Sequence, residues 1–256
     1  MSTFLLKLIA IISMTIDHVG AAIGTTCVDG KLYLSGLIPE DTYNLLRCIG
    51  RLAFPIYCYL IVEGYYHTRS LKKYGTRLFV FSIISQVPFS LAFLKSPTDF
   101  SDLNVYFTLL FGLICVYLVD VAKKKYAECK NNGTSAALYI VGCPIAVILI
   151  MVFSIFIHTD YSAFGIMLIL LFYFFRTDKE KPLTDAKNAH KFIWLFISFG
   201  LVTYVFSNTV EMLGLLALLP IGLHNNKKGP SMKYVFYAYY PVHLLILYLI
   251  FKQLHG

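Results

Sequence analysis

Two ionisable side chains stand next to each other in the first strongly apolar stretch of the sequence, IAIISMTIDHVGAAIG. They are Asp17 and His18. Histidine can act as a general base near neutral pH, and a nearby carboxylate can orient an imidazole or stabilise its protonated form. An ionisable group at the centre of a bilayer costs on the order of 3 kcal/mol, so each one needs a partner, a water-filled cavity or a function. Asp17 and His18 are therefore the first candidates for catalytic residues.

The second apolar segment carries two arginines four residues apart, Arg47 and Arg51. Residues at this spacing share one face of a helix. An ion pair between Asp17 and Arg51 would offset much of the cost of burying both charges. Adjacent helical residues point roughly 100° apart, so Asp17 and His18 can border one cavity without facing the same line. A purely structural role for the Asp17–Arg51 pair is the alternative that these residues leave open.

Three further polar residues lie in or beside other apolar segments. Asn104 opens the segment LNVYFT, Asp160 lies in HTDYSAFG between two apolar segments, and His243 follows a proline in YYPVHLLIL. Asp160 is a second acid that could orient the imidazole of His18. His243 is either a second candidate base or a helix-to-helix hydrogen-bonding group.

The elements that must position these residues are membrane helices. Of 256 residues, 58% are hydrophobic and 14% charged, and the mean hydropathy is +0.69, far more apolar than a soluble domain. Hydropathy predicts nine spans, at residues 4–24, 45–63, 77–94, 103–121, 136–157, 161–175, 190–207, 209–223 and 234–251. The sixth and eighth are short, so eight full crossings is the alternative. We predict one all-α domain over residues 1–256, a polytopic helix bundle around a polar pore.

Basic residues are concentrated in alternate loops between the predicted spans. One set of segments holds 17 of the 22 basic residues: Lys7, Arg69, Lys72, Lys73, Arg77, Lys123, Lys124, Lys125, Lys130, Arg176, Lys179, Lys181, Lys187, Lys191, Lys227, Lys228 and Lys233. By the positive-inside rule these segments are cytoplasmic, so the N-terminus lies inside. The net charge of +8 is thus a signal of topology in a cytoplasmic membrane, with attraction to membrane lipids as a second reading, and not one of nucleic-acid binding.

Motifs of several soluble enzyme classes are absent. The six cysteines are scattered without C-x-x-C spacing, which argues against zinc, haem attachment or a disulfide framework, and we predict no metal site. There is no G-x-S-x-G elbow, no G-x-x-x-x-G-K-[ST] loop and no H-E-x-x-H helix. Serine hydrolysis, nucleotide hydrolysis and metalloproteolysis are therefore weak candidates.

Several motifs in order along the chain resemble those of one family. LKLIAIISMTIDHVG, IGRLAFPIYCYLIVEGYYHTR, YGTRLFVFSIISQVPF, LNVYFTLLFGL, DYSAFGIMLILLFY and YPVHLLIL are similar to successive motifs of the TraX family, which is named for a conjugative pilin N-acetylase. The Asp-His, Gly-Arg-x-x-Phe-Pro and Tyr-Pro-x-His-Leu elements are the most specific. That family is more distantly similar to transmembrane acyltransferases, which move acetyl groups from cytosolic acetyl-CoA to acceptors on the far face.

The resemblance implies a membrane acetyltransferase with His18 at the centre of the chemistry, beside Asp17 and Arg51. Arg51 and Asn104 could then donate hydrogen bonds to the thioester oxygen as negative charge develops on it. The acceptor would be an amine or hydroxyl of an extracytoplasmic peptide, a pilin or a glycan, a choice that the motifs leave open.

Acetyl-CoA is the expected acyl donor, and its negatively charged nucleotide end needs basic partners. The basic residues at one helix end are the candidates: Arg69, Lys72, Lys73 and Arg77. Ordinary charges that set the topology are the alternative reading for each of them. The rival function is a transporter or flippase, because polar groups near the membrane midplane and proline-broken helices would look the same. A membrane scaffold without catalysis is the third reading.

Overall fold

The computed structural model describes residues 1–28, 31–129, 133–177, 185–207, 209–225, 227–230 and 232–255. Three of the basic residues used to predict the topology, Lys130, Lys179 and Lys181, lie outside the described residues.

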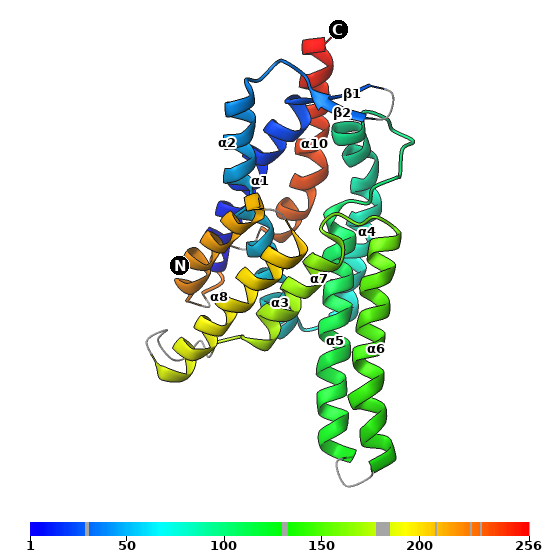
Figure 1. Ribbon diagram of the computed structural model, residues 1–256, viewed down its shortest axis with the longest axis vertical. Helices are drawn as coiled ribbons and strands as arrows, with labels where there is room; N and C mark the ends of the chain where they lie inside the picture. Colours follow the sequence, from blue (N-terminus) through cyan, green and yellow to red (C-terminus); the bar gives the residue numbers. More distant parts are fainter. Residues whose placement is uncertain are drawn as a thin grey trace.

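The described part of the chain is mainly helical (Figure 1). Its longer helices are α1 (Thr3–Ile23), α2 (Glu40–Gly50), α3 (Ala53–His67), α4 (Leu71–Phe89), α5 (Val105–Cys129), α6 (Gly133–Phe156), α7 (Ser162–Phe174), α8 (Ala186–Phe206) and α10 (Lys233–His255). Three short helical segments complete them: the π-helix η1 (Ser90–Leu94), the 3-10 helix η2 (Thr209–Ala217) and α9 (Leu218–Gly222). The predicted all-α membrane bundle is confirmed.

Seven helical segments among the described residues are long and apolar enough to cross a membrane, which makes the chain a multi-pass membrane protein. All nine predicted segments are present as helices, but the sixth and eighth are too short for a full crossing. Ser162–Phe174 has 13 residues, about 20 Å of helix against a hydrocarbon core of about 30 Å. Thr209–Gly222 is also short and is partly 3-10 helix. The prediction of nine full spans is therefore wrong for these two segments.

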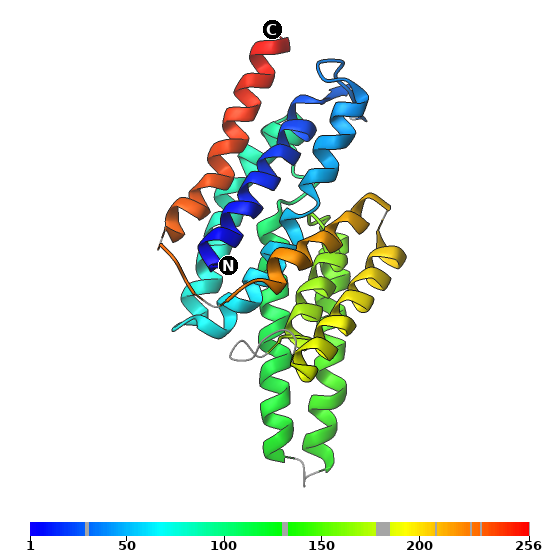
Figure 2. The same ribbon diagram turned by 90° about the vertical axis from the view of Figure 1, so that its left-hand side faces the viewer.

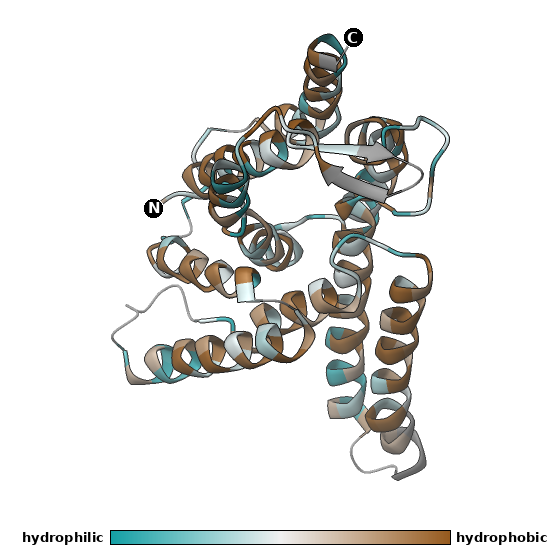
Figure 3. Ribbon diagram, turned by 45° about the horizontal axis from the view of Figure 1, so that its top comes forward, coloured by the Kyte–Doolittle hydropathy of each residue, from teal (hydrophilic) through white to brown (hydrophobic). Residues whose placement is uncertain are grey.

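The helices pack around α1 and α3. α1 packs against α2, α3 and α10, whereas α3 packs against α5, α7 and η2. In Figures 1 and 2, α5 and α6 lie side by side as an antiparallel pair and extend beyond the other helices at the end away from the C-terminus. Figure 3 shows hydrophobic residues along most of the helices and hydrophilic ones mainly in connections and near helix ends, as a lipid-exposed surface requires.

A small β-hairpin interrupts the helical pattern directly after α1. Strand β1 (Thr25–Val28) pairs antiparallel with β2 (Lys31–Leu34), with Thr25 opposite Leu34. This hairpin was not predicted from the sequence. It lies at the same end of the bundle as the C-terminus (Figure 1).

The second predicted span is two helices with a break at Arg51. The amides of Arg51 and Leu52 bond to carbonyls three residues back, in the tighter 3-10 pattern. Pro55, in the first turn of α3, has no N–H to give to the carbonyl of Arg51. The proline therefore ends the regular α2 hydrogen bonding at Arg51.

Candidate functional site

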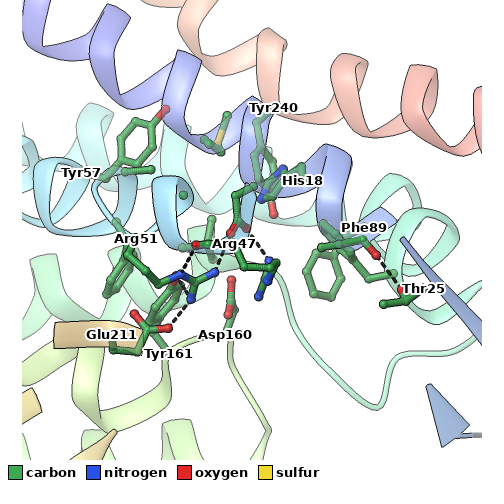
Figure 4. Close-up of a pocket in the computed structure, with 18 of the residues that line it drawn as sticks. His18, Thr25, Arg47, Arg51, Tyr57, Phe89, Asp160, Tyr161, Glu211 and Tyr240 are labelled. Carbon is green, nitrogen blue, oxygen red and sulfur yellow. Dashed lines mark hydrogen bonds and ion pairs between the residues drawn. The ribbon is translucent and has the colours of Figure 1, made fainter. Parts of the chain in front are cut away.

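A cavity of about 430 Å³ lies between the C-terminal half of α1, the α2–α3 break and the turn before α7. We call it the His18 cavity (Figure 4). Its lining contains most of the predicted catalytic residues and several others: Met14, Asp17, His18, Ala21, Thr25, Tyr43, Arg47, Gly50, Arg51, Ala53, Phe54, Tyr57, Phe89, Phe93, Val105, Asp160, Tyr161, Glu211 and Tyr240.

Asp17 is held by two arginines on its partner helix. Arg47 Nη1 donates to Asp17 Oδ2 at 2.6 Å, and Arg51 Nη2 donates to Asp17 Oδ1 at 2.6 Å. The spacing of four residues on α2 puts both guanidinium groups on the face that packs against α1. The predicted ion pair of Asp17 with Arg51 is confirmed, and Arg47 completes it.

Arg51 is bound on its other side as well. Its Nη1 contacts the carboxylate of Glu211 on η2 and lies 3.5 Å from the hydroxyl of Tyr161, and its Nε donates to the carbonyl of Arg47 at 3.0 Å. The side chain of Arg51 is only 7% exposed. Since its donors are engaged in this way, the guanidinium orders the site, and the predicted donation to a thioester oxygen gains no support from the geometry.

Glu211 and Tyr161 are site residues that the sequence reasoning missed. Glu211 could have been found, because it is a carboxylate inside the apolar segment 209–223. Tyr161 carried no comparable signal. Its ring stacks on Phe54 with centroids 3.6 Å apart, a contact that depends on how α3 and the turn before α7 meet.

Gly50 allows α2 to approach α1 at the ion pairs. A Cβ atom built at this position would overlap the side chain of Asp17. Any larger residue at Gly50 would push α2 away from α1 and lengthen the contacts of Asp17 with both arginines.

His18 has a direct partner on α10. Its Nδ1 lies 2.7 Å from Nε2 of His243, and Nδ1 of His243 lies 2.8 Å from the carbonyl oxygen of Tyr239. A carbonyl only accepts, so His243 Nδ1 carries the proton and, in neutral His243, Nε2 is an acceptor. His18 Nδ1 therefore donates to it, and the remaining nitrogen of neutral His18, Nε2, carries a free lone pair.

The ring of His18 is held by aromatic contacts on several sides. It is parallel to His243, with centroids 5.0 Å apart, and meets Phe93 edge to face at 5.1 Å. Phe93 lies on the π-helix η1, which follows the proline near the end of α4. Its wider turn, a feature often found near functional sites, lies beside the imidazole. His243 itself is 5% exposed and does not line the cavity, so it is a positioning residue for His18.

Asp160 projects into the His18 cavity from the turn before α7 (Figure 4). Its amide donates to the carbonyl of Leu103 at 2.8 Å, and Thr108 donates to its carbonyl. The next two residues, Tyr161 and Ser162, have φ of 60° and 37°, a region that costs on the order of 1–3 kcal/mol for residues other than glycine. The turn is thus held in an unfavourable conformation that presents this carboxyl to the cavity.

The carboxyl of Asp160 forms no hydrogen bond or ion pair with the side chains that the structure describes. Burial in this turn outside the helices, together with the negative charge of Asp17 and against the opposing effect of Arg47 and Arg51, raises its pKa to about 7. Asp160 therefore gains or loses its charge near neutral pH. It is not the acid that orients His18, because Nδ1 of His18 is engaged by His243.

Asn104 does not line the cavity. It is fully buried, and its side-chain nitrogen donates to the carbonyl of Ser82 at 2.7 Å and to Oε1 of Gln86 at 2.8 Å. Its side-chain oxygen accepts from the amide of Tyr106. The structure uses Asn104 to join α4 to the start of α5, so the predicted role as a donor to the thioester oxygen is not brought into place.

A second cavity of about 390 Å³ lies at the opposite ends of the same helices. We call it the Lys7 cavity. It is lined by Thr3, Lys7, Ile11, Tyr57, Leu60, Ile61, Glu63, Gly64, His67, Thr68, Tyr74, Arg77, Leu78, Tyr106, Leu109, Lys228, Phe236 and Tyr237. Tyr57 belongs to the lining of both cavities.

Of the four predicted phosphate-binding residues, Arg77 alone lines the Lys7 cavity. Its Nε has no hydrogen-bond partner among the described residues. Arg69, Lys72 and Lys73 are exposed and lie outside the cavity wall. The basic residues that join Arg77 there are Lys7 and Lys228, which the sequence reasoning used only for topology.

In the described part of the chain, no group of three or more His, Cys, Asp or Glu side chains is arranged to hold a metal ion.

Comparison with known proteins gives a match over nearly the whole chain. The family model described as TraX protein matches residues 2–251. A probable fimbrial assembly protein FimC (serogroup H1) of Dichelobacter nodosus is 27% identical over 96% of this chain and 94% of its own length. An uncharacterized protein of Rickettsia prowazekii (strain Madrid E) is 27% identical over 65% of this chain and 53% of its own length. No solved structure matches.

Proposed function

Because the chain belongs to the TraX family, we propose that it is a membrane acetyltransferase that moves an acetyl group from acetyl-CoA to an amine or hydroxyl acceptor. One observation carries this proposal. The hydrogen bonds from His18 to His243 and on to the carbonyl of Tyr239 leave His18 Nε2 unprotonated beside a cavity. A base of this kind is what acyl transfer from a thioester requires.

During the transfer step, His18 first accepts a proton and then donates it. Nε2 takes the proton from the attacking amine or hydroxyl, whose nitrogen or oxygen forms a bond to the thioester carbon. The carbon–sulfur bond then breaks, and the departing CoA sulfur receives the proton from Nε2. His243 keeps the other ring nitrogen occupied throughout, so the base presents the same atom in each turnover.

The Lys7 cavity fits the donor. Lys7, Arg77 and Lys228 face it, and no described acid forms an ion pair with any of the three. Glu63, the acidic residue in this lining, is bound to Arg176 at 3.0 Å. The phosphates of CoA would meet positive charge here, and the narrow pantetheine arm would extend past Tyr57 toward His18.

The acceptor would enter the His18 cavity from the opposite side. Asp160 lines this cavity, and its carboxyl forms no hydrogen bond or ion pair with the described side chains, so it could bind the amine or hydroxyl of the acceptor. Among the relatives is a probable fimbrial assembly protein, which supports a subunit of a surface fibre as one acceptor, alongside other extracytoplasmic peptides and glycans.

This scheme requires the Lys7 cavity to face the cytoplasm, where acetyl-CoA is made. The N-terminus would then lie on the cytoplasmic side of the cytoplasmic membrane. Lys124 at the same end of the bundle is 71% exposed. In a cysteine-free background, Lys124→Cys should be labelled by a membrane-impermeant maleimide only after the cells are opened. Labelling in intact cells would show that this end of the bundle faces outward, which would contradict the proposed orientation.

The activity is tested with purified protein, acetyl-CoA and a panel of amines, peptides and glycans, by measuring release of free thiol. We expect acceptor-dependent thiol release, and a loss of about 10²–10⁴-fold in His18→Ala. His158→Ala is the matched control, because His158 is exposed and lies outside both cavities, and it should keep the wild-type rate.

If the wild-type protein neither binds acetyl-CoA nor releases thiol with any acceptor, the proposed activity is wrong. If it transfers acetyl and His18→Ala does so equally well, the activity stands and the assignment of the base is wrong.

A further inference from the structure

The His18 cavity and the Lys7 cavity share one wall residue, Tyr57 on α3. Its side chain is partly exposed. Tyr57 is therefore in contact with both cavities. In Figure 4, Tyr57 lies above Arg51 and to the left of His18.

Two other helices, α1 and α10, change from lining one cavity to lining the other over a short distance. On α1, Ile11 lines the Lys7 cavity and Met14, three residues later, lines the His18 cavity. On α10, Tyr237 lines the Lys7 cavity and Tyr240, three residues later, lines the His18 cavity. Because three residues are less than one helical turn, the boundary between the cavities on these two helices is a narrow level of the bundle.

One side of this narrow level is a fixed aromatic wall. Tyr106 on α5 packs edge to face on Tyr240, with centroids 5.2 Å apart, and its hydroxyl donates to the carbonyl of Tyr237 at 3.2 Å. Tyr237 is in turn stacked on Phe81 at 5.0 Å. These rings hold one another in place.

Tyr57, which lines the same cavity as Tyr106, is held differently. Among the described residues no hydrogen bond to its hydroxyl and no ring stacked on it are found, although the hydroxyl interacts electrostatically with those of Tyr106 and Tyr239. The backbone that carries it is rigid, because Pro55 and the buried Ile56 and Cys58 anchor this turn of α3. The phenol ring thus borders both cavities without stacking on a neighbouring ring among the described residues.

We propose that Tyr57 sets the size of the acyl group that this protein transfers, by limiting what passes from the Lys7 cavity to His18. The proposal rests on the acyltransferase function proposed above. An acetyl group needs little room beside the ring, whereas each added methylene must fit between Tyr57 and the wall formed by Tyr106 and Tyr240. The preference for acetyl-CoA is thus steric and belongs to the ring, not to the hydroxyl.

The test compares acetyl-, propionyl- and butyryl-CoA as donors with one acceptor, and measures kcat/KM for each by thiol release. Tyr57→Ala should raise the ratio of butyryl-CoA to acetyl-CoA activity by about tenfold or more, since one methylene in a tight pocket is worth roughly 10–200-fold. Tyr57→Phe keeps the ring and should leave the ratio unchanged. Tyr57→Leu, a smaller change, should give an intermediate ratio and serves if the alanine variant does not fold.

Tyr43→Ala is the matched control. Tyr43 also lines the His18 cavity, but it does not border the Lys7 cavity, so its loss should not alter the ratio. An unchanged ratio in folded, acetyl-transferring Tyr57→Ala and Tyr57→Leu overturns this proposal and leaves the acetyltransferase function standing. A changed ratio in Tyr57→Phe, or an equal gain in Tyr43→Ala, also overturns it. If wild type transfers no acyl group at all, the proposed function fails as well.

Discussion

The two cavities of this bundle contain similar charged residues but use them differently. In the His18 cavity, Asp17, Arg47, Arg51 and Glu211 neutralise one another in a connected network. In the Lys7 cavity, the carboxylate of Glu63 is bound to Arg176, while Lys7 and Arg77 face the cavity without an acid at ion-pairing distance in the described residues. Paired charges fix a shape, whereas positive charges without acid partners can bind an anion. Pairing, not composition, therefore separates the two cavities.

The largest effect should come from breaking the network at Arg51. Arg51→Met would leave Asp17 and Glu211 without a shared cation in a buried site, at a cost of about 3–5 kcal/mol. Thermal unfolding in detergent should show a large drop in Tm. Arg47→Met is the matched variant: its side chain is 29% exposed against 7% for Arg51, so the loss should be clearly smaller. Equal losses would mean that Arg51 is not the centre of the network.

The next largest effect concerns the positioning of His18. His243→Phe keeps a ring beside His18 but removes the acceptor for its Nδ1 proton. We expect kcat to fall about 100-fold, since His18 can then present a protonated Nε2, with little change in the KM for acetyl-CoA. Tyr239→Phe is the control, because the contact uses the backbone carbonyl of Tyr239. An unchanged kcat in His243→Phe would show that His18 does not need this partner.

A smaller effect should follow from separating α1 and α2. Gly50→Ala puts a Cβ atom onto Asp17 and should cost about 1–3 kcal/mol of stability, as overpacking does elsewhere. Gly75→Ala on α4 is the matched control, since its Cβ would meet nothing closer than 3.9 Å, and it should be neutral or stabilising. A neutral Gly50→Ala would mean that α2 can shift without loss of the ion pairs.

The smallest effects are expected in the Lys7 cavity. Lys7→Gln and Arg77→Gln should each raise the KM for acetyl-CoA about fivefold, or ~1 kcal/mol, with kcat unchanged and the effect reduced by salt. Lys72→Gln is the control, because Lys72 is exposed and lies outside the cavity. If Lys72→Gln raises KM as much as Arg77→Gln, the donor binds on the open surface and the contrast between the cavities is lost.

The helix-bundle fold and the ion pair between Asp17 and Arg51 could be predicted from the sequence. Asp17 and Arg51 are charges in apolar segments, and the cost of burying either one alone made their pairing a sound inference. Helix spacing placed Arg47 on the same face. The positions of the nine apolar segments followed from hydropathy, although two of them are too short to cross the membrane.

The partner of His18 could not be predicted in the same way. Asp17, Asp160 and His243 all had suitable chemistry, and the choice among them depends on how α10 packs against α1, 225 residues away along the chain. The role predicted for Asn104 could not be judged from the sequence for the same reason. Its amide could donate to a substrate, but the packing of α4 on α5 places it where it donates to Ser82 and Gln86 instead.

The sequence by itself determined which residues had to be satisfied inside a membrane, because the cost of a buried charge is a property of the residue and of the lipid. The tertiary structure decided which partner satisfied each one and which were left over. His18 Nε2, the carboxyl of Asp160 and the ring of Tyr57 face cavities only because helices from distant parts of the chain meet around them. The free lone pair of His18 and the position of the Tyr57 ring depend on contacts with residues of other helices. The spacing of residues within one helix does not specify which other helices will pack against it.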